Sequence, residues 1–166
     1  MTNLDKQEII QILRRCELFL GLEDEGLMKV ASLASISQKS FKTGDVISHE
    51  AEAAEKLYIL IEGKVELRMN IPLDLDNYTR EITVDTVSRG SVFHWSALVR
   101  PYVLSRTSCC AEDCKVLSIN GKELIKLMDN NMTIGYEIMQ SIAYLISSRL
   151  RTPNNYFWAE TLRRWQ

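Results

Sequence analysis

The chain has 166 residues, of which 46% are hydrophobic and 25% are charged, with 20 basic and 22 acidic side chains. This composition excludes a disordered chain, which would combine few hydrophobic residues with a large net charge. The length is typical of one domain that buries about 70% of its unfolded surface without disulfide or metal cross-links. The net charge of -2 argues against a generally basic nucleic-acid-binding protein.

The sequence shows neither a membrane helix nor a secretory signal, and this indicates the cellular compartment. No apolar run approaches the ~20 residues of a membrane helix, and the N-terminus has no basic segment leading into an apolar one, so no secretory signal is visible. We therefore expect a cytoplasmic protein without a membrane span, whose thiols stay reduced. Cys109 and Cys110 are adjacent and cannot both reach one metal from a strand, so we interpret the cysteines as buried structural thiols.

Two helices are predicted over residues 4–35. Residues 4–16 place apolar side chains at i, i+3, i+4 and i+7, which indicates an amphipathic helix. The segment Leu18–Leu22 breaks this pattern and is interpreted as a buried loop. Asp24 is predicted to cap a second helix that runs to about Ser35.

From Phe41 onward the pattern is typical of strands. The apolar run Leu57–Ile61 predicts a strand buried on both faces, and Glu62–Gly63 predicts a tight turn. Residues 64–69 alternate, which predicts that Val65, Leu67 and Met69 face a core, and Asn70–Arg80 is predicted to be a polar loop. Further strands are predicted over 81–87, from Val92, and as a pair over 108–119.

After Gly121 the helical period returns. Residues 122–128 predict a short helix and 132–151 a long one, which Pro153 ends because proline lacks a backbone N–H. The long helix carries a stripe that is interpreted as a subunit interface, as the face that packs on the strands, or as both. The stripe consists of Ile134, Ile138, Ile142, Leu145 and Arg149, with Met139 and Ile146 beside it.

The order of elements predicts an α+β fold, because a run of strands is flanked by segregated helices. About eight short strands with tight turns favour a jelly-roll-like β-roll over residues 41–119. N-terminal helices at 4–35 and C-terminal helices at 121–151 complete one predicted domain of residues 1–152. Residues 153–166 form an aromatic tail, which either covers an apolar patch or docks another protein.

Four segments together resemble the cyclic nucleotide-binding domain family. Residues 13–22 match its opening L-x-x-x-x-L-F-x-x-L, and residues 41–47 match F-x-x-G-(D/E)-x-I. Residues 57–65 match L-Y-(I/V)-(I/L)-x-x-G-x-V, and residues 90–93 match G-x-x-F. The resemblance covers about residues 13–150. It implies a β-roll whose last, long helix pairs with a partner subunit, so we expect a homodimer through helix 132–151.

The cassette that binds the ligand in this family departs from the family pattern here. The resemblance implies F-G-E-(L/I)-A-L, in which Glu accepts a hydrogen bond from the ribose 2′-OH, followed by an Arg that neutralises the cyclic phosphate. In this sequence His94 stands where Gly belongs and Trp95 where Glu belongs, while Arg106 fits the arginine if the loop is one or two residues longer. The candidate ligand-binding residues are His94, Trp95, Ser96, Ala97, Arg106 and Thr107.

These departures predict weak or no binding of cyclic AMP and cyclic GMP. Upstream, Glu50–Ala54 replaces the family's E-G-D-x-G. The first hypothesis is a non-enzymatic regulatory or sensor domain for a small ligand other than the cyclic nucleotides, or one that binds them weakly. The second is a structural dimerisation or protein-interaction module whose pocket is plugged. The third is a true cyclic nucleotide-binding signalling domain.

No cofactor, metal or enzyme activity is predicted. His94 is interpreted as a hydrogen-bonded histidine at the pocket mouth, and a haem ligand is the alternative, although no second axial ligand is evident. Only two histidines exist, so a cupin-type metal site is not expected. Fifteen residues follow Arg151, fewer than the ~20 of a helix-turn-helix. We therefore expect no direct DNA binding, and either a protein partner or a fragment of a longer chain.

Overall fold

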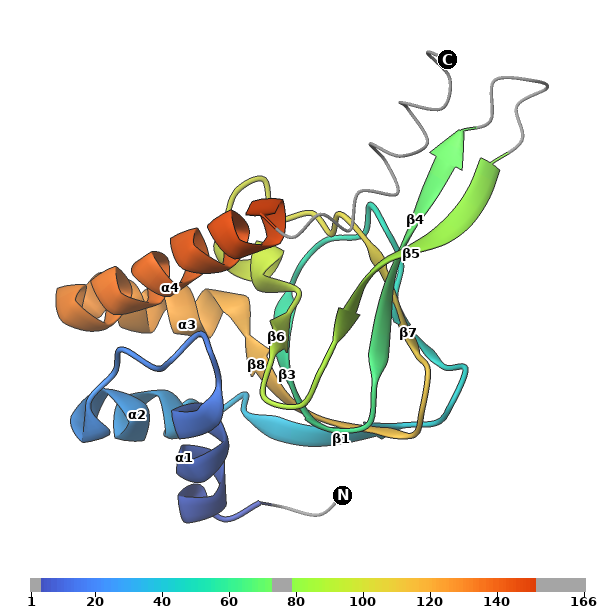
Figure 1. The fold of residues 1–166 in the computed structure, drawn as a ribbon. Coiled ribbons are helices and arrows are strands. Elements are labelled where there is room, and N and C mark those ends of the chain that lie inside the picture. The colour runs from blue at the N-terminus through green and yellow to red at the C-terminus, as the bar shows by residue number, and fades with distance from the viewer. Residues whose placement is uncertain (1–3, 73–78, 152–166) are drawn as a thin grey trace.

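The computed structural model describes residues 4–72 and 79–151, and within them the α+β prediction is confirmed. Figure 1 shows the helices gathered at one side of a β-roll, while the β4–β5 hairpin projects at the other. The helices are α1 (Lys6–Arg15), α2 (Asp24–Ala31), the short 3-10 helix η1 (Trp95–Leu98), α3 (Gly121–Asn130) and α4 (Met132–Arg151). The strands are β1 (Ser37–Phe41), β2 (Val46–Ser48), β3 (Lys56–Glu62), β4 (Val65–Pro72), β5 (Thr79–Val87), β6 (Val92–Phe93), β7 (Thr107–Cys110) and β8 (Cys114–Asn120).

The strands form two antiparallel sheets of four, which confirms the eight-stranded β-roll. Their orders are β1-β8-β3-β6 and β2-β7-β4-β5. Strands β3 and β4 therefore belong to different sheets, although only two residues separate them. The tight turn predicted at Glu62–Gly63 carries the chain from one sheet to the other and does not close a hairpin.

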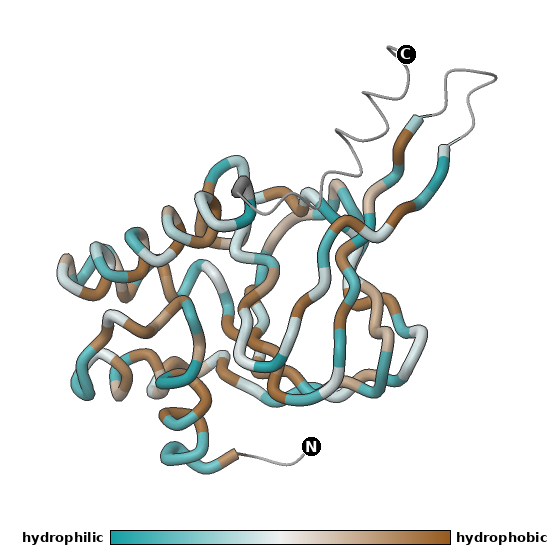
Figure 2. Tube along the Cα trace, viewed as in Figure 1, coloured by the Kyte–Doolittle hydropathy of each residue, from teal (hydrophilic) through white to brown (hydrophobic). Residues whose placement is uncertain are grey.

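Strand β3 is buried on both faces, as its apolar run predicts. Leu57 and Ile59 join the core between the first sheet and the helices, while Tyr58 and Leu60 join the core inside the roll. Figure 2 shows hydrophobic stretches alternating with hydrophilic ones along the strands and helices. One strand thus connects two cores, which fixes the helices relative to the roll.

The second N-terminal helix, α2, differs from its prediction at both its first and its last residue. Helix α1 opens with a capping box between Asp5 and Glu8. Asp24 does not cap α2 but is its first helical residue, and its carboxylate accepts a hydrogen bond from Arg14 at 2.7 Å. The helix ends at Ala31 and not near Ser35, because the chain turns there to enter β1.

Two strand boundaries also differ from prediction. Strand β1 begins at Ser37, before Phe41, because backbone pairing with β8 holds a polar segment that lacks a strand pattern. The loop predicted at Asn70–Arg80 was made too long at both ends. Pairing of β4 with β5 continues to Pro72 and resumes at Thr79. Residues 73–78 lie outside the described part of the chain.

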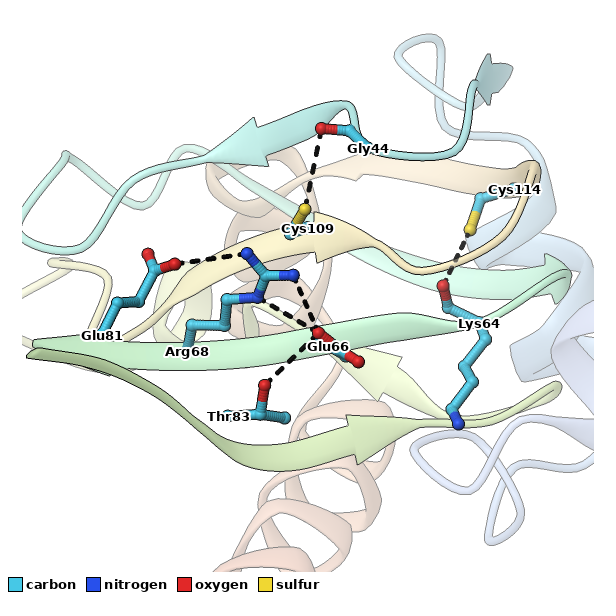
Figure 3. Close-up of polar contacts among 8 residues, drawn as sticks. All are labelled: Gly44, Lys64, Glu66, Arg68, Glu81, Thr83, Cys109 and Cys114. Carbon is cyan, nitrogen blue, oxygen red and sulfur yellow. Dashed lines mark hydrogen bonds and ion pairs between the residues drawn. The ribbon is translucent and has the colours of Figure 1, made fainter.

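The β4–β5 hairpin is held by a charged cluster that Figure 3 shows. The Arg68 guanidinium contacts the Glu66 carboxylate at 2.9 Å and the Glu81 carboxylate at 3.2 Å. The Arg68 hydrogen bond holds the pKa of Glu66 below its ordinary value. Val65 and Leu67 are buried as predicted, but the register shift between Leu67 and Arg68 interrupts the alternation. Met69 is consequently only half-buried.

Helix α4 begins and ends at the predicted residues, and its stripe packs on the domain itself. Ile134, Ile138, Ile142 and Leu145 all lie in the core shared with the first sheet. Pro153 and the predicted aromatic tail lie outside the described residues. Among residues 4–72 and 79–151, no helix has the length and apolar character needed to cross a membrane.

The cysteines are free and buried, in agreement with their interpretation as structural thiols. Burial raises the pKa of Cys16 to about 12 and that of Cys110 to about 12, so neither forms a reactive thiolate near neutral pH. Figure 3 shows the Cys109 thiol directed at the Gly44 carbonyl and the Cys114 thiol at the Lys64 carbonyl. The described residues contain no group of three or more metal-ligating side chains.

A substitution at Gly63 tests the turn that carries the chain from β3 in one sheet to β4 in the other. Its φ is +89°, and a Cβ there would collide with the Asp113 carbonyl. Gly44 has a φ of +88° but open space around it, so it serves as the matched control. Both Gly63→Ala and Gly44→Ala incur the strain of a left-handed residue, about 1–3 kcal/mol. We expect Gly63→Ala to lower the free energy of unfolding by at least ~1 kcal/mol more than Gly44→Ala.

Urea unfolding followed by circular dichroism measures this difference as a shift in the transition midpoint. Equal midpoints for the two variants would show that Gly63 is required only for its backbone angle, and that the close contact with Asp113 is not as described.

Candidate functional site

The cassette region lies between β6 and the loop before β7. His94 follows β6 directly and precedes the short 3-10 helix η1. A cavity of about 40 Å³ opens beside it. Ligand pockets are usually about 300–1,000 Å³, so this one has room for only a few atoms. Its walls are Leu67, His94, Trp95, Ser96, Leu104, Ser105, Arg106 and Arg149.

His94 is buried, and its Nε2 atom and its ring both make close contacts. Its Nε2 lies 2.8 Å from Ser48 Oγ and 3.0 Å from Ser108 Oγ, and the two hydroxyl oxygens are 2.9 Å apart. The imidazole meets the rings of Tyr58 and Phe93 edge-on at centroid distances of 5.3 and 4.9 Å. Burial lowers the pKa of His94 from 6.5 to about 4, so the ring is neutral at pH 7.

The backbone keeps a left-handed conformation where the family pattern places glycine. His94 has a φ of +60° and Ala51 a φ of +68°, and each occupies a position where the resemblance implies Gly. Such angles cost a non-glycine residue on the order of 1 kcal/mol or more. The surrounding contacts of His94 offset this cost. Both positions therefore have the left-handed backbone that glycine readily adopts, although each residue carries a side chain.

The structure brings four of the six predicted site residues to one cavity. His94, Trp95, Ser96 and Arg106 line it. Ala97 and Thr107 are buried nearby but do not line it.

Thr107 supports the loop beside the cavity. Its Oγ1 accepts a hydrogen bond of 3.0 Å from the backbone N–H of Glu50. The side chain of Glu50 accepts a hydrogen bond from the Asn70 N–H and does not line the cavity. Among the described wall residues, none carries a carboxylate.

Ser48, Ser108 and Arg149 are among the residues of the site that the sequence did not predict. Ser48 and Ser108 are ordinary strand residues whose meeting at His94 depends on sheet pairing, and no sequence pattern marks them. Arg149 was assigned to the α4 stripe, yet its guanidinium donates to the Val92 carbonyl at 3.3 Å and lies 3.6 Å from the Asp85 carboxylate. The sequence offered one indication of this role, because Arg149 is a basic residue at the end of an apolar stripe.

The site does not fit a haem. His94 Nε2, the atom that would bind iron, is already hydrogen-bonded to two serines. The cavity of about 40 Å³ is also far smaller than a macrocycle. The haem alternative is therefore not supported by these residues.

The buried imidazole makes stability depend on pH. The unfolded state takes up a proton below about pH 6.5, but folded His94 does so only below about pH 4. Stability therefore falls as the pH drops through this window, by about 3 kcal/mol in total for this group. The Arg106 and Arg149 side chains line the same cavity as His94.

Unfolding free energies measured in urea from about pH 7 to pH 4 test this effect. His94→Gln is expected to remove most of the loss, whereas His49→Gln, at an exposed histidine, is expected to keep it. An unchanged pH dependence in His94→Gln would contradict the buried neutral imidazole.

Comparisons with known proteins identify the family and the fold. The family sequence model for the cyclic nucleotide-binding domain matches residues 38–131. A protein from Geobacter metallireducens described as a cyclic nucleotide-binding protein is 32% identical, with a TM-score of 0.69, over 85% of this chain and 97% of that one. No curated protein matches the chain.

Two further solved structures share the fold. The N-terminal domain of a transcriptional regulator from Streptomyces coelicolor is 25% identical, with a TM-score of 0.67, over 82% of this chain and 91% of that one. A cyclic nucleotide-binding domain from Methylobacillus flagellatus is 16% identical, with a TM-score of 0.72, over 88% of this chain and 78% of that one. The chain belongs to the cyclic nucleotide-binding domain family of regulatory and sensor domains.

Proposed function

We propose that the chain is a non-enzymatic regulatory domain that binds a small ligand other than cyclic AMP or cyclic GMP, or binds these only weakly. The observation that carries this proposal is the wall of the cassette cavity. Trp95 forms part of that wall where the family pattern has the ribose-binding acid, and about 40 Å³ remains open. A site without the acid gains little from the ribose hydroxyl.

The charge of the cavity favours a small anion as its ligand. Arg106 and Arg149 both line it, and the described wall residues include no acid. Arg106 donates to the Ser105 carbonyl next to it, and within residues 4–72 and 79–151 it forms no ion pair with a carboxylate. A phosphate or carboxylate group would find two guanidiniums there, and such groups bind oxyanions in bidentate fashion.

Arg149 connects the cavity to helix α4, because it belongs to that helix and lines the cavity. Its contacts with Val92 and Asp85 fasten the last turns of α4 to β6 and β5. An anion in the cavity would compete with Asp85 for the guanidinium. A ligand that binds one position of α4 more tightly shifts the population toward it, which is how a sensor of this design would respond.

Restoring the family cassette tests the proposal. We expect the wild-type protein to show no saturable binding of cyclic AMP up to about 1 mM by isothermal titration calorimetry. The variant His94→Gly/Trp95→Glu should bind at least about tenfold more tightly than His94→Gly/Trp95→Gln, which opens the same space without the charged acceptor.

Thermal unfolding of each variant establishes that it is folded before titration. If the double variants do not fold, Trp95→Glu and Trp95→Gln form the second pair. Micromolar binding of cyclic AMP to the wild-type protein would contradict the proposal, and so would equal affinities of the Glu and Gln variants.

A second feature favours self-association as part of the function. The outer face of α4 carries exposed apolar residues at alternating spacings of four and three, which is the pattern of a coiled-coil seam. We propose that this seam pairs with the same seam of a second copy. Its residues are Met132, Tyr136, Met139, Ala143 and Ile146.

A charge on this seam is expected to separate the copies. Sedimentation velocity at micromolar concentration should show a dimer for the wild-type protein and a monomer for Met139→Glu, because a carboxylate cannot be buried without a partner. Tyr144→Glu alters an exposed residue off the seam and should remain dimeric. A monomeric wild-type protein, or equal dissociation of both variants, would contradict the pairing.

A further inference from the structure

A second cavity, of about 240 Å³, lies between α1 and the roll. It shares no lining residue with the cassette cavity. Its volume approaches the lower end of the ~300–1,000 Å³ typical of ligand pockets, so it could hold a molecule of metabolite size. Helix α1, strand β3 and the turn between β5 and β6 supply its walls. The lining residues are Gln11, Ile12, Arg15, Leu60, Ile61, Arg89 and Gly90.

Two arginines give this cavity its charge. Arg15 and Arg89 are exposed, and neither guanidinium makes a hydrogen bond or ion pair with another described residue. The neighbouring Arg14, by contrast, pairs with Asp24 at 2.7 Å. Two like charges that face one hollow repel each other until an anion lies between them.

No acid within the described chain competes for these arginines at the cavity wall. The nearest acid in sequence to Arg15 is Glu17, whose carboxylate accepts a hydrogen bond from the Val92 N–H at 3.1 Å. Glu17 does not line the cavity. The Gln11 side chain adds an amide that can donate to an oxyanion or accept from its hydroxyl.

The remaining wall is apolar. Ile12 and Ile61 are half-buried and line the cavity with apolar side chains. A hydrated inorganic ion would leave the apolar part of the cavity wall exposed to water. An anion that carries a small apolar body would cover it while its charged end meets the arginines.

We propose that this cavity is a second small-molecule site, which takes an anion with a compact apolar group, such as an aryl or short alkyl phosphate or carboxylate. The proposal does not depend on the ligand of the cassette cavity, because the two sites use different arginines.

The second site is connected to the cassette through β6. The Gly90 N–H donates to the Leu60 carbonyl at 2.8 Å at the cavity wall. Two residues later Val92 begins β6, and its carbonyl accepts the hydrogen bond from Arg149 of α4. A ligand at Gly90 would therefore contact the segment that also positions His94 and α4.

Phenyl phosphate, phenol and inorganic phosphate are suitable probes of the charge and the apolar body separately. We expect 15N-labelled protein of the full chain to show saturable amide shifts centred on Gly90 and Arg89 with phenyl phosphate, with a Kd of about 1 mM or tighter. Phenol should give no saturable shift, and inorganic phosphate should bind at least about tenfold more weakly.

Arg15→Gln and Arg89→Gln should each weaken phenyl phosphate binding by about tenfold or more. Arg14→Gln is the matched control, since Arg14 lies next to Arg15 but does not line the cavity, and it should leave the affinity unchanged. Arg106→Gln in the cassette cavity should leave it unchanged as well. The proposal is overturned by the absence of saturable shifts, by equal losses in Arg14→Gln and Arg15→Gln, or by shifts that depend on Arg106.

Discussion

The hydrogen bonds of one buried imidazole hold the turn between β6 and η1 in place. His94 follows β6 in the first sheet, while its two hydroxyl partners, Ser48 and Ser108, belong to β2 and β7 in the second. These bonds tie the cassette turn across the interior of the roll. They also hold the turn in a left-handed conformation at a residue that has a side chain. In this arrangement Trp95 stands in the wall of a cavity of about 40 Å³.

The proposed specificity and response both depend on the small cavity that remains beside His94. The remaining hollow is small, positively charged and without an acid among its described walls, which favours an oxyanion over a nucleoside. Arg149 belongs both to that hollow and to α4, so one side chain connects the site with the helix. The helix in turn has an inner stripe buried on its own domain and an outer seam that is exposed. Movement of α4 would therefore alter both surfaces together.

The sequence predicted the parts of this structure that depend on local pattern. The apolar run of β3 and the helical period of α4 identified both elements, since burial imposes a clear pattern on each. The polar strand β1 and the ends of the β4–β5 hairpin were missed, because pairing with a distant strand overrides weak local preference. The cap assigned to Asp24 was wrong because the helix begins one residue earlier and uses this carboxylate to bind Arg14.

The site was predictable only where the family motif marked it. His94, Trp95, Ser96 and Arg106 could be aligned with the cassette, whereas Ser48 and Ser108 are separated from His94 by 46 and 14 residues and carry no motif. Their role depends on how the two sheets pack against each other, which no local sequence pattern reveals. Arg149 is similar, since its place in the site depends on how α4 crosses the roll.

A crystal structure of the wild-type protein grown with millimolar cyclic AMP tests the central claim most directly. The account predicts that His94 Nε2 stays bonded to both serines, that Trp95 remains in the wall, and that no nucleotide occupies the cavity. A nucleotide bound there, with its ribose hydroxyl held by a carboxylate of this chain, would contradict it.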